Sequence, residues 1–180
     1  MTRRDRGSNP LISTKNPCTY CVGVPFKKRL MKQMELITTY ICKKGDIGVH
    51  DNMFGGILVS LIDDASAAYA AQICDTPRVV TIKIDELVFK KPVKVNALLK
   101  IYGKVLEFGN TSVSLYIEVR KHNVRTGDQD IVTHTNIKFV RIDEDGNPIP
   151  ISPHIKDRYK ERVTKYGRGL IGKKNPESDE

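Results

Sequence analysis

The 180-residue sequence has no tryptophan, only 7 % aromatic residues and no long apolar run. Its best membrane candidate, residues 55–73, is interrupted by Asp63 and Asp64, whereas a spanning helix needs about 20 predominantly apolar residues. The basic start of the chain is not followed by the apolar stretch of a secretory signal. Hydrophobic residues still make up 39 % of the chain, which suits one packed core and excludes a disordered protein. We therefore expect one domain and no membrane segment.

Cysteine is also scarce, with four residues at positions 18, 21, 42 and 74. Cys18 and Cys21 have the spacing of half a zinc site or of a redox pair. No second pair of cysteines or histidines follows at a matching spacing, so the motif lacks the remaining ligands of a zinc site. We expect no metal and no redox cofactor, and reduced thiols in a cytoplasmic protein.

The middle of the chain lacks the basic excess that the two ends carry. The net charge is +9, but residues 1–44, 45–150 and 151–180 carry +8, −2 and +3. A nucleic-acid footprint needs basic residues on one folded face, and no zinc finger, recognition helix or RNA-binding sheet signature accompanies them. The excess is typical of solvated flanks, so nucleic acid is not the expected partner. Binding through the two flanks is kept as an alternative.

The hydrophobic pattern divides the chain into three parts. Residues 1–33 read as a basic leader, 34–151 as the folded domain, and 152–180 as a charged tail whose start can form a surface helix. Within the domain, alternation and turn residues predict one long helix over 54–74 and five strands over 34–44, 78–88, 97–106, 112–121 and 131–142. The short links favour antiparallel pairing. The predicted fold class is therefore α+β, with a five-stranded antiparallel sheet wrapped around one central helix and a second subunit covering the free face or edge.

The predicted helix has two unlike faces at about 100° per residue. The expected core face comprises Ile57, Leu58, Leu61, Ile62, Ala65, Ala68, Tyr69 and Ile73. The opposite face comprises Val59, Ser60, Asp63, Ser66, Ala67 and Ala70. A face of small residues around one carboxylate indicates that another backbone comes close to it.

The start of this helix is the best candidate for chemistry. Gly55 and Gly56 leave backbone N–H groups and the positive end of the helix dipole open to a ligand, so an oxygen that gains negative charge is stabilised there. Asp63, about two turns on, could act as a general base toward water or as a nucleophile, and Asn52 could orient water or a carbonyl. On spacing alone, the glycines could equally serve tight helix–sheet packing, and both interpretations stay open.

Five motifs resemble, in order and spacing, the hot-dog-fold acyl-CoA thioesterases, in the branch of cytosolic acyl-coenzyme A hydrolases. They are Asn52-Met53-Phe54-Gly55-Gly56, Leu61-Ile62-Asp63, Arg78-Val79-Val80-Thr81, Phe89-Lys90-Lys91-Pro92-Val93 and Thr111-Ser112-Val113-Ser114. The similarity covers about residues 35–151. It implies a hot-dog fold, hydrolysis of acyl-CoA to a fatty acid and coenzyme A, and no cofactor beyond the substrate's own coenzyme A.

The resemblance also implies roles for individual residues. It makes Asp63 the catalytic aspartate and Gly56 the N–H donor to the thioester carbonyl, with Asn52 beside them. It further implies a site between two subunits, commonly in a trimer of dimers. Residues expected to contact coenzyme A are Gly55, Arg78, Thr81, Lys90, Lys91, Thr111 and Ser112.

The sequence departs from the family pattern at two positions, and two other functions are kept as alternatives. Many family members have Asn at the position of Gly48 and Gly at the position of Asp51. The first rival is a non-catalytic acyl-CoA sensor on the same fold. The second is a hot-dog hydratase or dehydratase, for which His50 would be the catalytic histidine.

Overall fold

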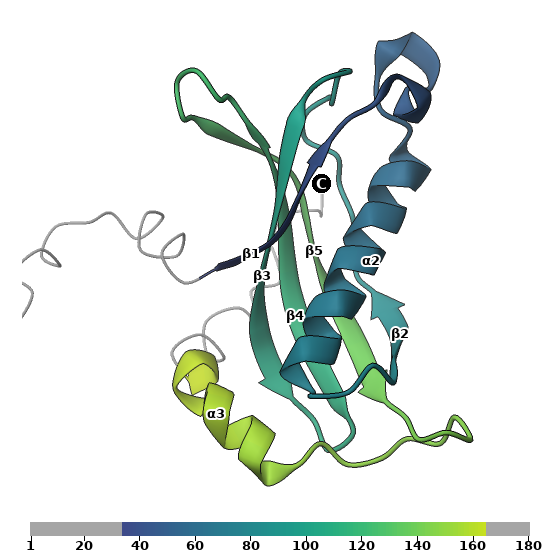
Figure 1. Ribbon diagram of the computed structural model, residues 1–180, viewed down its shortest axis with the longest axis vertical. Helices are drawn as coiled ribbons and strands as arrows, with labels where there is room; N and C mark the ends of the chain where they lie inside the picture. The colour runs from purple at the N-terminus through teal and green to yellow at the C-terminus, as the bar shows by residue number, and fades with distance from the viewer. Residues whose placement is uncertain (1–33, 165–180) are drawn as a thin grey trace, which may run out of the picture. The chain divides into compact units, whose positions relative to one another are not determined.

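The computed structural model describes the backbone of residues 34–164 and the side chains of residues 34–159. The expected leader with Cys18 and Cys21 lies outside the described residues, as does the tail from residue 165. The described helices and strands (Figure 1) are β1 (Glu35–Ile41), α2 (Gly55–Ile73), β2 (Val79–Ile84), β3 (Leu98–Phe108), β4 (Ser112–His122), β5 (Gln129–Arg141) and α3 (Pro153–Thr164). Two single 3₁₀ turns, at Lys44–Asp46 and Val49–Asp51, connect β1 to α2.

The five strands form one antiparallel sheet in the order β1-β3-β4-β5-β2. Each of the four strand pairs contains one register shift, and such irregularities bend a strand and increase its twist. The sheet curves around α2, which contacts all five strands, while α3 contacts β3 (Figure 1). The predicted fold class is confirmed.

Strand β2 is the element whose end was predicted least well. It stops at Ile84, four residues before the expected end at Val88. The chain nevertheless continues beside β5, because Asp85 N donates to Asn136 O at 2.9 Å and Lys90 N donates to Val132 O at 2.8 Å. These isolated bonds fix the path of the segment between β2 and β3 without making it a regular strand.

The core lies between α2 and the inner face of the sheet. Alternate residues of the three central strands point inward and are completely buried, as their β-branched and aliphatic character predicts. The fully buried members include Leu99, Ile101, Leu115, Ile117, Val119, Ile137 and Phe139. Gly103 belongs to this face because a Cβ there would lie 3.1 Å from the Tyr69 ring of α2 and 2.6 Å from Ile37 Cδ1.

The buried face of α2 is rotated from the predicted one toward the side of Asp63. Ser66 and Ala70, expected on the opposite face, are fully buried, whereas Ala68, expected in the core, is exposed. Small residues allow the helix to approach the sheet closely, and the Ser66 hydroxyl is satisfied by donating to Ile62 O. Ile57 and Leu61 pack at the margin of the core instead of at its centre.

The outer face of the sheet carries a polar layer. Lys104, Glu118 and Arg120 are each about 5–6 % exposed. Arg120 pairs with Glu118, which also accepts a hydrogen bond from Tyr116 Oη at 3.0 Å. Burial raises the pKa of Tyr116 and lowers that of Lys104. Arg120 and Glu118 thus compensate each other's charge on this face, and Lys104 Nζ lies 5.0 Å from the centre of the Tyr116 ring.

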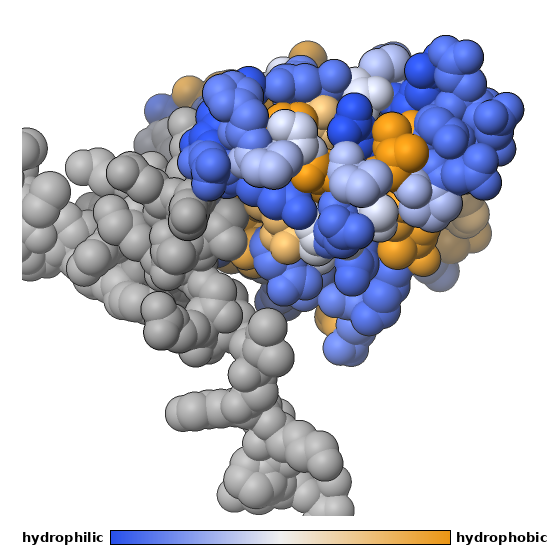
Figure 2. Space-filling model, turned by 90° about the horizontal axis from the view of Figure 1, so that it is seen from below, coloured by the Kyte–Doolittle hydropathy of each residue, from blue (hydrophilic) through white to orange (hydrophobic). Residues whose placement is uncertain are grey.

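Exposed apolar side chains gather instead on the edge strand β2. Val80, Ile82 and Ile84 are 39 %, 54 % and 36 % exposed. Seen from below, the described surface is mostly hydrophilic with separate apolar patches (Figure 2). Among residues 34–164, β2 pairs only with β5, so within this part of the chain its other edge has no strand partner for its backbone hydrogen-bonding groups.

Candidate active site

The start of α2 has two uncommitted backbone donors. Phe54 N donates to Asp46 O at 2.8 Å, and Phe54 O accepts from both Ile57 N and Leu58 N. Among the described residues no backbone acceptor lies at the N–H groups of Gly55 and Gly56. These two groups stand at the positive end of the helix dipole, where an anionic oxygen is stabilised.

Aromatic rings lie next to both glycines. A Cβ on Gly55 would lie 3.4 Å from Phe89 Cε2, and a Cβ on Gly56 would lie 2.6 Å from Phe54 Cε1. Both side chains are exposed, at 48 % for Phe89 and 61 % for Phe54. Either ring can move to make room for a methyl group, so packing alone does not require glycine here, and both interpretations of this motif stay predictions.

The loop before the helix has an unusual backbone. His50 and Asp51 both have positive φ, at 58° and 54°, which is costly for residues with a Cβ. The turn is closed by Gly48 N donating to Asn52 O at 2.8 Å. Glycine, which many family members have at the position of Asp51, would adopt this positive φ without strain. His50 is exposed and its carbonyl accepts from Lys94 Nζ at 3.2 Å.

A cavity of about 320 Å³ opens beside this helix start. Its lining comprises Asn52, Met53, Gly55, Leu58, Phe89, Lys90, Lys91, Pro92 and Val93. The side-chain Oδ1 of Asn52 is buried and has no hydrogen-bond partner among the described residues. The cavity therefore combines apolar walls with one unsatisfied polar group and an adjacent pair of free N–H groups.

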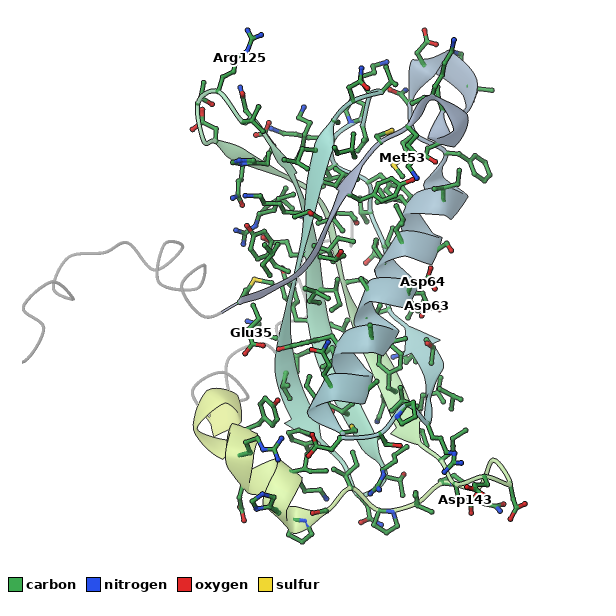
Figure 3. The ribbon with its side chains drawn as sticks, viewed as in Figure 1. Glu35, Met53, Asp63, Asp64, Arg125 and Asp143 are labelled. Carbon is green, nitrogen blue, oxygen red and sulfur yellow. The ribbon has the colours of Figure 1, made fainter. Side chains whose placement is uncertain are left out.

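Asp63 lies in the middle of α2, on the side of β2 (Figure 3). Its Oδ1 accepts a hydrogen bond from Thr81 Oγ1 at 2.8 Å, and both residues are half-buried. Thr81 is predicted to contact coenzyme A, a prediction that stands untested, and the structure places it against the candidate base. No local sequence signal marks this contact, because it depends on how β2 is registered against the helix.

The helix start and Asp63 are well separated within one chain. Asp63 follows Gly56 by seven positions, which corresponds to about 10 Å along the helix axis. Met53, beside the helix start, and Asp63 accordingly appear at different levels along α2 (Figure 3). One chain brings Asn52, Gly55 and Gly56 together, and separately brings Asp63 to Thr81.

The basic residues expected at coenzyme A each have a partner within the chain. Lys90 Nζ lies 3.2 Å from His134 Nδ1, and Lys91 Nζ lies 2.6 Å from Asp130 Oδ1. Arg78 pairs with Glu144 at 2.5 Å, with both side chains at least half exposed. Exposed pairs of this kind contribute little to stability, so their partners do not prevent them from binding phosphate.

Thr111 and Ser112 lie at the other end of the sheet from the helix start. Thr111 O accepts from Arg141 N at 2.8 Å, and Ser112 O accepts from Gly109 N at 2.8 Å. Ser112 and Val80 of β2 both pair with Val140 of β5, which places them in one row. These two hydroxyl residues are therefore nearer to the Thr81 end of the molecule than to Asn52.

Comparison with known proteins identifies the family. The sequence pattern of the Thioesterase superfamily matches residues 50–127 of this chain. The acyl-CoA thioester hydrolase YciA of Salmonella typhimurium is 31 % identical over 122 residues, which cover 66 % of this chain and 91 % of the relative. The chain belongs to the hot-dog-fold thioesterase family. The resemblance found in the sequence motifs is thereby confirmed.

Solved structures agree with this membership. A hexameric hotdog fold thioesterase of Campylobacter jejuni is 34 % identical with a TM-score of 0.62, covering 70 % of this chain and 96 % of that one. A hexameric thioesterase of Yersinia pestis is 29 % identical with a TM-score of 0.61, covering 66 % and 95 %. Within the described residues, this thioesterase has no helix long and apolar enough to cross a membrane. Residues 34–159 also contain no cluster of three or more His, Cys, Asp or Glu that could hold a metal.

Proposed function

We propose that this thioesterase hydrolyses acyl-CoA, with Asp63 as the general base and the N–H of Gly56 as the oxyanion donor. The observation that carries the proposal is the arrangement of α2, which begins with two uncommitted N–H groups and carries a hydrogen-bonded, half-buried carboxylate further along. The relative YciA is named an acyl-CoA thioester hydrolase, which supports acyl-CoA as the substrate of this protein.

The reaction needs only water and these groups. Asp63 takes a proton from water as the oxygen attacks the thioester carbonyl carbon, and the resulting oxyanion accepts a hydrogen bond from Gly56 N–H. Collapse of the tetrahedral intermediate breaks the C–S bond, and the leaving thiolate of coenzyme A takes up the proton. Thr81 holds the carboxylate of Asp63 in position, and Asn52 helps to place the carbonyl or the water. No metal or redox cofactor is required by this chemistry.

We further propose that one site uses Asp63 of one copy and Gly56 of a second copy. Within one chain Asp63 and Gly56 are about 10 Å apart along the axis of α2, whereas a second copy whose α2 lies beside the first would bring its helix start next to Asp63. The exposed edge of β2, with Val80, Ile82 and Ile84, lies next to Thr81 and supplies a surface for the second copy. The hexameric state of the two solved relatives supports a trimer of such dimers.

The first test is release of thiol from a panel of acyl-CoA esters. The wild-type protein should hydrolyse them, and Asp63→Asn should lower kcat about a hundred-fold to ten-thousand-fold, because a general base contributes that much. The variant should keep the wild-type melting temperature and oligomeric mass. Tight binding of the esters by the wild-type protein without thiol release would favour the sensor function instead.

A mixing experiment tests whether the site is shared. Gly56→Pro removes the N–H and is compatible with the first turn of a helix. If Asp63→Asn and Gly56→Pro chains are refolded together, each mixed dimer holds one site with both changes and one intact site. Random assortment then returns about a quarter of wild-type activity in a closed two-fold assembly. A site contained in one chain would give no recovery, which would refute the shared arrangement without refuting thioester hydrolysis.

A further inference from the structure

A short turn leads from β1 into α2 (Figure 1), and the carboxylate of Asp46 ties this turn to the strand. Asp46 Oδ2 accepts a hydrogen bond from the backbone N–H of Lys43 and another from the hydroxyl of Tyr40, each at 2.7 Å. Tyr40 is a half-buried residue of β1, and Lys43 follows that strand. The side chain of Asp46 therefore has two anchors, one in the strand and one just after it.

The backbone of Asp46 reaches the start of the helix. Its carbonyl oxygen accepts from Phe54 N at 2.8 Å, and Phe54 O accepts from Ile57 N and Leu58 N in the first turn of α2. Phe54 occupies the N-cap position, and among the described residues no side-chain hydrogen bond caps the helix there. Helices usually have Ser, Thr, Asp or Asn at this position. The beginning of α2 is thus held by backbone contacts, of which the one to Asp46 O lies next to the free N–H groups.

Other contacts of the turn do not involve this carboxylate. Gly48 N donates to Asn52 O and Met53 N donates to Val93 O, both at 2.8 Å. These backbone bonds should survive a change of the Asp46 side chain, whereas its connection to β1 should not. Loss of the carboxylate should therefore loosen the position of the Asp46 carbonyl oxygen without unfolding the turn.

We propose that Asp46 and Tyr40 are positioning residues for the oxyanion donor. Anchored to β1, Asp46 holds Phe54 through its carbonyl oxygen, and Phe54 in turn places the N–H of Gly56, two residues later. This role rests on the proposed function, in which that N–H stabilises the oxyanion. The donor must be aligned with an oxygen that carries its charge only in the transition state. Misplacement should therefore lower kcat and leave KM nearly unchanged.

The test measures thiol release from the acyl-CoA ester that the wild-type protein hydrolyses fastest. Tyr40→Phe removes one hydrogen bond to the carboxylate and should lower kcat about three-fold, with KM within about two-fold of wild type. Asp46→Ala removes both hydrogen bonds and should lower kcat about ten-fold, again with little change in KM. Asp46→Asn keeps an oxygen that can accept these bonds, so it should recover part of the loss.

Tyr116→Phe is the matched control. It also removes a tyrosine hydroxyl that donates to a carboxylate, since Tyr116 Oη donates to Glu118 Oε2 at 3.0 Å, but on the outer face of the sheet. Its kcat should stay at the wild-type value. Melting temperature and mass in solution are measured for every variant, so that loss of folding is separated from loss of rate.

A double variant tests whether the effect passes through Gly56. In Gly56→Pro the donor is already absent, so adding Asp46→Ala should change kcat by less than about two-fold, whereas independent losses multiply. A merely structural contribution of Asp46 would give the multiplied loss.

The possible results separate this role from the proposed function. Wild-type kcat in both folded Tyr40→Phe and Asp46→Ala proteins, an equal loss in Tyr116→Phe, or a multiplied loss in the double variant would overturn the positioning role while leaving thioester hydrolysis intact. Wild-type kcat in Gly56→Pro would refute the donor on which the role depends. Absence of thiol release from every ester by the wild-type protein would refute the proposed function and this role with it.

Discussion

The start and the middle of α2 present different kinds of polar group. At the start the groups are the backbone N–H donors of Gly55 and Gly56, which lie in the first turn and have no backbone acceptor among the described residues. In the middle the group is the side chain of Asp63, which accepts a hydrogen bond from Thr81 of the neighbouring strand. The first region depends on main-chain groups and the second on one specific side-chain contact, so substitutions should affect them in different ways.

The largest difference is expected between two changes at the same glycine. Gly56→Pro removes the donor and should lower kcat about a hundred-fold to a thousand-fold, the usual effect of losing one oxyanion donor. Gly56→Ala introduces the same close approach to Phe54 but keeps the N–H, and the exposed ring can turn away, so most activity should remain. Steady-state kinetics on one acyl-CoA compares the two. Equal losses would mean that space at this position, and not the N–H, is what matters.

A smaller effect is expected at Thr81. Thr81→Val keeps the shape of the side chain but removes the hydrogen bond to Asp63, and should reduce kcat about ten-fold with little change in KM, because a hydrogen bond to a charged group is worth about 1.5–3 kcal/mol. Thr81→Ser should retain most of the activity. Wild-type kinetics in that variant would show that Asp63 needs no support from β2.

The smallest effect concerns the connection of β1 to the helix start. Two hydrogen bonds to the Asp46 carboxylate hold its pKa below the ordinary value. The larger effect comes from the backbone N–H of Lys43 and the smaller from the Tyr40 hydroxyl, and each donor lies 2.7 Å from Asp46 Oδ2. Because the pKa of Asp46 is lower in the folded protein, its ionised form stabilises the fold at pH values above the ordinary carboxyl pKa. This stabilisation is lost as the pH falls through the lowered pKa.

Melting temperatures across pH check this contribution. Asp46→Asn should melt below the wild-type protein at neutral pH, and the two should converge in acid. Glu86→Gln, a change at an exposed carboxyl, is the control for a general charge effect. A difference between Asp46→Asn and the wild-type protein that stays constant from neutral to acid pH would contradict the assignment.

Local patterns were sufficient to predict the elements of the fold. Alternation located β4 from Ser112 to Lys121 against an observed end at His122, and the apolar period and Pro77 located the helix. The buried face of α2 was predicted less well, because the apolar period assigns large hydrophobic residues to the core and gives little weight to small or polar ones. Ser66 and Ala70 are fully buried although neither is strongly hydrophobic.

The site was predicted in part for a related reason. Asn52, Gly55 and Gly56 are neighbours in the chain, so a motif can reveal them. The contact between Asp63 and Thr81 spans 18 positions and depends on strand register, which no local pattern contains. Individual roles for these residues, and for Arg78, Thr111 and Ser112 further along the sheet, stay predictions.

The strand order has a consequence for how the protein folds. Strands β3, β4 and β5 follow one another in the chain and pair with their neighbours, so they can form a local meander early. Strand β2 must instead pair with β5 across the whole meander, as Val79 opposite Arg141 shows. Distant pairings form late because the intervening chain must first be ordered. Thr81 travels with β2, so we expect a folding intermediate to contain the core before Asp63 has gained its partner.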